Sequence, residues 1–168
     1  EKLNWMNQQY LLKLPEEEYF RMIDDVIQKG DYHDQDPGKI RQAAEILKTR
    51  LVTLSDLNKK LGLFFEENPE IKDLQAIEVL KEENSKTVLK EFLKQAENLD
   101  QLTSENLGQL VKSVQKSTGI KGRGLWMPLR CAITREVSGP ELPAMLDFFG
   151  GEKCLHLIRQ TLENPSLN

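Results

Sequence analysis

Cysteine and histidine are scarce in this sequence, which limits the metal chemistry it can support. Its 168 residues include two cysteines, Cys131 and Cys154, and two histidines, His33 and His156. Neither cysteine belongs to a CxxC pair, and structural zinc sites combine four cysteine and histidine ligands. We therefore expect no metal site, and we interpret the cysteines as small buried residues of a reducing compartment. The sequence alone leaves a disulfide between them open.

Long hydrophobic runs are also missing. No apolar stretch approaches the roughly 20 residues that span a bilayer, and the start at Glu1 and Lys2 shows no signal-peptide pattern. Hydrophobic residues at 39% and charged residues at 30% are typical of a soluble globular chain. The expectation is a cytoplasmic protein that does not associate with membranes, folded as one domain or two small ones.

Recognisable catalytic motifs are absent. The sequence contains no GxSxG elbow, no HExxH zinc helix and no Walker loop. His33 lies between Asp31 and Asp34 and could hold a metal, but a polar loop between two helices is the favoured interpretation. We expect no catalytic residue and no cofactor in these 168 residues.

The chain lacks the excess of basic residues that is typical of nucleic-acid binders. Its formal net charge is −4, and binding to phosphates needs clustered lysine and arginine. The charge is uneven, however. Residues 119–168 carry six basic and five acidic groups, a balance of +1, whereas residues 1–118 carry 17 and 22, a balance of −5. A local basic surface is therefore compatible with the acidic total.

Strand patterns are nearly missing, and short amphipathic helices fill the chain. Apolar residues recur at helical spacing in most segments, and no Asn-Gly or Asp-Gly hairpin occurs. Pro15 followed by three glutamates predicts a helix start. Asp36 before Pro37 predicts an N-cap, and Thr103 predicts another, with a hydrophobic staple around it. The predicted fold class is all-α.

Two breaks interrupt the helical pattern. A junction of turn residues lies at 62–71, and a glycine-rich stretch lies at 119–124. Because the second break is the sharper one, we place the subdomain boundary near Thr118-Gly119. The prediction is two consecutive helical bundles, one at 1–118 and one at 119–168.

The segment at 119–142 is the most informative, and it reads GIKGRGLWMPLRCAITREVSGPEL. A basic, glycine-rich start leads into an apolar cluster around Trp126. Pro128 usually kinks a helix or starts one, and a start here would leave backbone N–H groups ready to bind phosphate. Trp126 could stack on an unpaired base, although burial in the core is the commoner fate of a tryptophan between leucine and methionine.

This segment resembles the signature of the C-terminal anticodon-binding region of bacterial glutamyl-tRNA synthetases. The shared pattern is a Lys-Gly start, aromatic-x-Pro-Leu-Arg, Ala-aliphatic-Thr and Gly-Pro-Glu-Leu, which stand here at 121–122, 126–130, 132–134 and 139–142. A second match lies over a hundred residues away, where Leu-Asn-Trp-Met-Asn at 3–7 resembles the helix that follows the catalytic core in this family. Nearly the whole chain can be aligned with the family in this way.

The resemblance implies a fold, a partner and a parent enzyme. In this family the C-terminal half is an α-helical cage of two subdomains that grips the anticodon loop, so tRNA(Glu) is the expected partner of a monomeric chain. The parent would be a glutamate–tRNA ligase. Its catalytic half, with the ATP and glutamate sites, would lie outside these residues, which by themselves would be inactive and would need no cofactor.

The resemblance also implies residue roles. By position, Arg50 matches the arginine that reads the third anticodon base, and a guanidinium fork suits the acceptor edge of an unpaired cytosine. Without the resemblance, Arg50 would be interpreted as a helix end that complements the helix dipole. Arg130, Pro140 and Leu142 match positions that line the pocket for the other two bases. Arg130 would contact a base or phosphate, and Pro140 and Leu142 would supply apolar surface.

Three further cations are expected to contact phosphates. Lys121 and Arg123 flank the glycine-rich start. Arg135 is a departure, because the family commonly has glycine there, and it would add a cation near the expected RNA face. The family also commonly has glycine where Gln8 stands, which we expect to affect only a helix surface.

Two other functions suit a helical chain without catalytic motifs. A protein-interaction adaptor would bind partner helices in an exposed apolar groove and would not bind RNA. The anticodon-binding region of another class I synthetase, such as the lysine-specific one, would prefer a different tRNA. Binding assays with glutamate and lysine tRNAs separate these possibilities.

Overall fold

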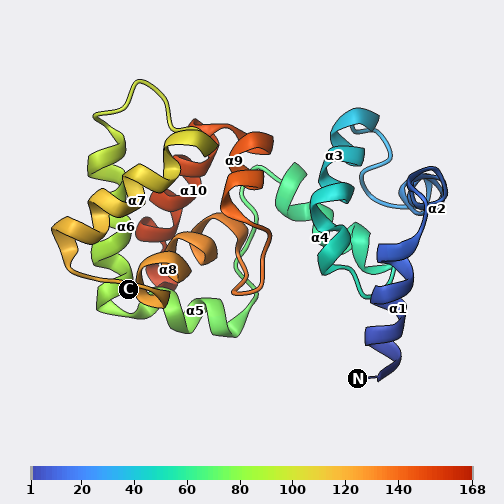
Figure 1. Cartoon of the computed structure of the whole chain (residues 1–168), viewed down its shortest axis with the longest axis horizontal. Helices are drawn as coiled ribbons and strands as arrows, with labels where there is room; N and C mark the ends of the chain where they lie inside the picture. Colours follow the sequence, from blue (N-terminus) through green and yellow to red (C-terminus); the bar gives the residue numbers. More distant parts are fainter. Residues whose placement is uncertain (1, 168) are drawn as a thin grey trace. The chain divides into compact units, whose positions relative to one another are not determined.

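The computed structural model describes residues 2–167, and most of them lie in helices. No strand occurs in this range, which confirms the predicted all-α class. The chain divides into two compact units between Glu67 and Asn68, and their elements are labelled in Figure 1. None of the described helices is long and apolar enough to cross a membrane.

The first unit extends to Glu67 and is organised around a buried tyrosine. Its elements are α1 (Lys2–Lys13), α2 (Glu16–Gln28), α3 (Pro37–Leu47), the 3₁₀ turn η1 (Lys48–Arg50) and α4 (Asp56–Phe65). Tyr19 of α2 is fully buried, and its hydroxyl donates to the Ala44 carbonyl of α3 at 2.8 Å. Burial raises the pKa of Tyr19, so the hydroxyl keeps the proton that it donates.

The second unit begins at Asn68 and is organised around α6. Its elements are α5 (Leu74–Lys81), α6 (Glu83–Ala96), α7 (Ser104–Thr118), α8 (Arg123–Thr134), α9 (Leu142–Phe149), α10 (Gly151–Glu163) and the 3₁₀ turn η2 (Pro165–Leu167). Helix α6 contacts α5, α7, α8 and α10, and Figure 1 shows α7, α8 and α10 gathered around it. Its Phe92 is fully buried, as are Leu129 of α8 and Ile158 of α10.

The predicted helix starts depend on local chemistry, and two caps are confirmed. The Asp36 carboxylate accepts from the backbone N–H of Lys39 at 2.8 Å at the start of α3. Thr103 and Asn106 form a reciprocal capping box at the start of α7. Each cap satisfies a backbone N–H that the first helical turn would otherwise leave unpaired.

The boundary between the compact units differs from the predicted one. Gly119 ends α7 in a left-handed conformation with φ 72°, which produces the sharp break seen in the sequence. The chain then returns, so that α8 packs on α6 and α5 and α9 packs on α7. The glycine-rich stretch therefore connects two helices of one unit, and the units divide instead within the junction at 62–71.

Both cysteines are free and fully buried, as the sequence favoured. Cys131 lies in α8 and Cys154 in α10. Burial raises the pKa of each thiol to about 12, so neither carries appreciable thiolate at neutral pH. Within the described residues, no group of three His, Cys, Asp or Glu side chains is placed to hold a metal ion.

The unit boundary predicts which shorter polypeptides fold. A polypeptide of residues 68–168 should keep its helical circular dichroism and unfold in one cooperative transition, because it contains all the partners of α8. A polypeptide of residues 119–168 should unfold without a cooperative transition, because α6 and α7 are missing. Urea titrations of the two polypeptides measure the difference. Cooperative unfolding of the shorter one would restore the boundary at Gly119.

Candidate nucleic-acid interface

Helix α8 starts earlier than its proline suggested. Gly122 precedes it with φ 56°, a conformation that favours glycine, and Pro128 lies inside the helix instead of at its start. An internal proline costs about 3 kcal/mol relative to alanine. Burial of Leu125, Leu129 and Ile133, at about 1.5–3 kcal/mol each, outweighs that cost.

One face of α8 is turned to solvent. Seven of its residues are buried, namely Leu125, Pro128, Leu129, Cys131, Ala132, Ile133 and Thr134. The remaining long side chains are Arg123, Trp126, Met127 and Arg130. Their spacing of i, i+3, i+4 and i+7 places them on one face of the helix. We call these four residues the α8 stripe, which contains two cations, one aromatic ring and no carboxylate.

Trp126 is not a core residue, contrary to the favoured interpretation of the sequence. Its side chain is 43% exposed, whereas its neighbour Leu125 is almost fully buried. Consecutive helical residues point about 100° apart, so an apolar run in sequence need not be buried as a block. The tryptophan therefore belongs to the α8 stripe.

The basic residues around the α8 stripe differ in their surroundings. Lys121 and Arg123 are exposed at the start of the helix, which is compatible with the expected phosphate contacts. Arg130 is partly buried, and its Nη2 donates to Glu141 at 3.0 Å. Because the Glu141 side chain is largely exposed, this ion pair contributes at most about 1 kcal/mol to stability. The ion pair directs the Arg130 guanidinium toward Glu141.

Pro140 and Leu142 do not form the apolar surface that the resemblance implied. Both are buried, and Leu142 is only 3% exposed at the start of α9. Gly139, the residue before Pro140, packs closely on the end of α8. A Cβ added at Gly139 would lie only 2.0 Å from the Thr134 hydroxyl oxygen, so no larger residue fits there without a shift. The two buried residues flank Glu141, the partner of Arg130.

Arg50 lies in the first unit, whereas the other predicted contact residues lie in the second. It is the last residue of η1, is partly buried, and lies three residues after the buried Leu47. Gln8 of α1 donates to the Thr49 carbonyl at 2.7 Å. Gln8 therefore ties α1 to the turn that carries Arg50, a contact that the expectation of a plain helix surface had missed.

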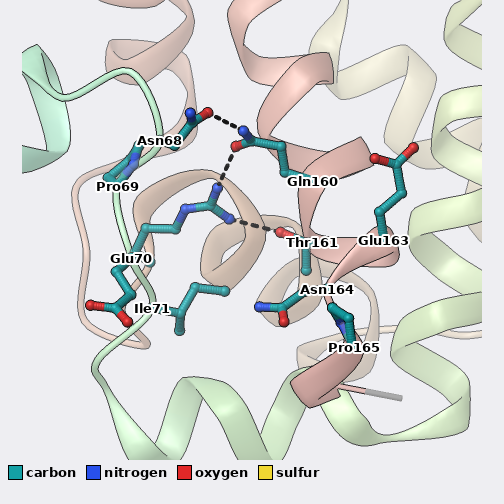
Figure 2. A pocket seen from close by; sticks show the side chains of 10 residues that line it. Asn68, Pro69, Glu70, Ile71, Gln160, Thr161, Glu163, Asn164 and Pro165 are labelled. Atoms are coloured by element: carbon teal, nitrogen blue, oxygen red, sulfur yellow. Dashed lines mark hydrogen bonds between the residues drawn. The ribbon is translucent and has the colours of Figure 1, made fainter.

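Arg135 is a buried structural residue, which corrects its expected role as a phosphate contact. It is 6% exposed, and Nη1 donates to the Ala132 carbonyl at 2.8 Å and to the Thr161 hydroxyl at 2.7 Å. Nη2 donates to Gln160 at 3.2 Å. Gln160 in turn donates to Asn68, and Figure 2 shows these two side chains facing each other. Burial lowers the pKa of Arg135 to about 10, so the side chain remains charged at neutral pH.

The space beside Arg135 does not suit a phosphate. A pocket of about 370 Å³ lies between the segment after Asn68 and the end of α10. Glu70 and Glu163 line it, and their carboxylates would repel an anion. The α8 stripe is the better candidate for contacts with nucleic acid.

Comparisons with known proteins agree with the resemblance. Residues 8–162 match the family model of an anticodon binding domain. A glutamate–tRNA ligase of Latilactobacillus sakei is 32% identical in an alignment 166 residues long, and the alignment covers 96% of this chain and 33% of that protein. A glutamate–tRNA ligase of Listeria monocytogenes is 35% identical in an alignment 176 residues long, and the alignment covers 97% of this chain and 34% of that protein. The chain thus spans about a third of the length of these relatives.

The fold is also found in a solved structure. A crystal structure of a glutamate tRNA ligase from Elizabethkingia meningosepticum, in complex with its amino acid, covers 96% of this chain with a TM-score of 0.70. The matched part is 32% of that protein, at 22% sequence identity. This likeness supports the arrangement of the helices.

The backbone at Arg135 yields a test by substitution. Arg135 has φ 64°, a left-handed conformation that costs a residue other than glycine about 1–2 kcal/mol. Arg135→Gly and Arg135→Ala both lose the hydrogen bonds of the guanidinium. Only the alanine variant still has to hold a residue with a Cβ in the left-handed conformation. The glycine variant should therefore unfold with a free energy about 1 kcal/mol higher than the alanine variant, as measured in urea.

At a matched control position, Arg159, the order of stability of the glycine and alanine variants should be the opposite. Arg159 is exposed within α10, where glycine is about 1 kcal/mol less favourable than alanine. Arg159→Ala should therefore be more stable than Arg159→Gly. If the alanine were also the more stable substitution at Arg135, the left-handed conformation would not be a cost there.

Proposed function

Because the chain belongs to the anticodon binding domain family, we propose that it reads the anticodon of tRNA(Glu) as part of a glutamate–tRNA ligase. The family match over residues 8–162 and the glutamate–tRNA ligase relatives support this proposal. The observation that carries it is the α8 stripe, which presents the exposed Arg123, the partly exposed Arg130 and the exposed Trp126 on one helix face of an acidic chain. Clustered cations beside an aromatic ring are typical of surfaces that bind single-stranded nucleic acid.

The proposed contacts divide between reading and holding the RNA. Arg50 would donate its guanidinium fork to the acceptor edge of the third anticodon base. Arg130, oriented by Glu141, would contact another base or its phosphate. Lys121 and Arg123 would contact phosphates, which hold the RNA in register but carry no sequence information.

The activity of the parent would need more than this chain. Attachment of glutamate to tRNA would use ATP and glutamate sites in the remaining two-thirds of a protein as long as the relatives. The chain itself would bind tRNA weakly in the cytoplasm, as a monomer, without a cofactor and without charging it. A preference for glutamate tRNA over lysine tRNA would distinguish this function from that of the lysine-specific relative.

Arg50 provides the most specific test. Arg50→Gln should weaken discrimination at the third anticodon base by about 1–3 kcal/mol, the usual value of a lost bidentate contact to a base. The measurement is the affinity for tRNA(Glu) and for a tRNA changed at that base alone. Arg21→Gln removes the same charge from an exposed position of α2 and should leave the ratio of affinities unchanged. Full discrimination by the Arg50→Gln variant would remove Arg50 from the proposed site.

A phosphate contact should behave differently. Lys121→Ala should weaken the binding of all tRNAs by the same factor, and it should reduce the slope of log affinity against log salt by roughly 0.7 for one lost contact to a single strand. Titrations at several salt concentrations measure the slope. A change in base preference with an unaltered slope would contradict the assignment of Lys121 to a phosphate.

A further inference from the structure

We propose that Trp126 is the stacking platform for one unpaired anticodon base, a role that rests on the proposed function. Apolar surface for the bases was expected from Pro140 and Leu142, and both are buried. Trp126 is 43% exposed on the α8 stripe, so it presents the aromatic surface that those residues do not.

The exposure of Trp126 is unusual within its unit. A tryptophan can bury 150–250 Å² of surface, at about 25 cal/mol per Å² of apolar area, so leaving 43% of Trp126 in solvent forgoes part of that stabilisation. Among the described residues of the second unit, the exposed large apolar side chains are Leu74 and Trp126, of which only Trp126 is aromatic. The core below is filled by Leu125 and Leu129, whereas a large part of Trp126 stays in contact with solvent.

The neighbours of Trp126 define the kind of ligand that fits. Arg123 lies three residues before it and Arg130 four residues after it on the same face, which corresponds to roughly 4.5 and 6 Å along a helix. A base stacked on the indole would therefore have a guanidinium on either side for its phosphates or base edges. A partner helix would instead require a continuous apolar groove, whereas the apolar part of this stripe is one indole and one methionine between cations.

Stacking makes a prediction that depends on ring shape. Trp126→Ala should weaken binding of an RNA stem-loop carrying the tRNA(Glu) anticodon by roughly 5- to 140-fold, which corresponds to about 1–3 kcal/mol for one base stacked on an aromatic ring. Trp126→Phe keeps a flat ring and should lose less. Trp126→Leu keeps apolar bulk without a flat ring and should lose as much as alanine. Trp5→Ala is the control for loss of another exposed indole, which is 62% exposed in α1, and should keep full affinity.

A second measurement identifies the base. Three stem-loops are prepared, each lacking the base of one anticodon nucleotide. The affinity of each stem-loop is measured for the unsubstituted chain and for the Trp126→Ala variant. At one position the two changes should be non-additive, because removing the base and removing the ring break the same contact. Full additivity at all three positions would overturn the proposal that Trp126 stacks on an anticodon base.

The outcomes separate this proposal from the function on which it rests. If the unsubstituted chain does not bind the stem-loop, both fail. If the chain binds and Arg130→Gln weakens binding, but Trp126→Leu binds as well as tryptophan, then the stacking role fails and the proposed function stands. Circular dichroism of each variant verifies that the substitution leaves the fold intact.

Discussion

The packing of α8 against α6 decides which residues of the candidate site face solvent. Burial of Leu125, Leu129 and Ile133 fixes the rotation of the helix and holds it in place despite the internal proline. Once that rotation is fixed, the α8 stripe lies on the face away from the core, with Arg123 and Trp126 exposed and Met127 and Arg130 partly exposed. Affinity for RNA would thus follow from a hydrophobic constraint inside the second unit, which presents cations and an aromatic ring together on a chain of net charge −4.

Arg135 shows how one chain can fill a position that favours glycine. The left-handed backbone at the end of α8 disfavours side chains, but the guanidinium extends into the unit and bonds to α8 and α10. These hydrogen bonds join elements that are distant in sequence. Gln160 bonds to Arg135 and also to Asn68, so the same network reaches the start of the second unit. The Arg135 guanidinium therefore serves the fold and leaves the proposed RNA contacts to other residues.

Local features of the fold could be predicted from sequence, and long-range ones could not. The caps at Asp36 and Thr103 depend on neighbouring residues alone, so pattern and structure agree there. The unit boundary depends on α8 returning to α6, which no local pattern records, and a sharp glycine turn was therefore mistaken for a domain boundary. Trp126 was assigned to the core because its neighbours are apolar, although the rotation of the helix separates it from Leu125. The burial of Leu142 and Arg135 was likewise set by partners outside the motif.

The most direct test follows the indole N–H signals of the chain by NMR as anticodon stem-loop RNA is added. The sequence has two tryptophans, so Trp126 reports on the α8 stripe, while Trp5 in α1 serves as the reference for non-specific effects. The account predicts a saturable shift of the Trp126 signal, with the same dissociation constant as binding itself. A Trp126 signal that stays in place when the chain is saturated with RNA would show that the RNA binds elsewhere.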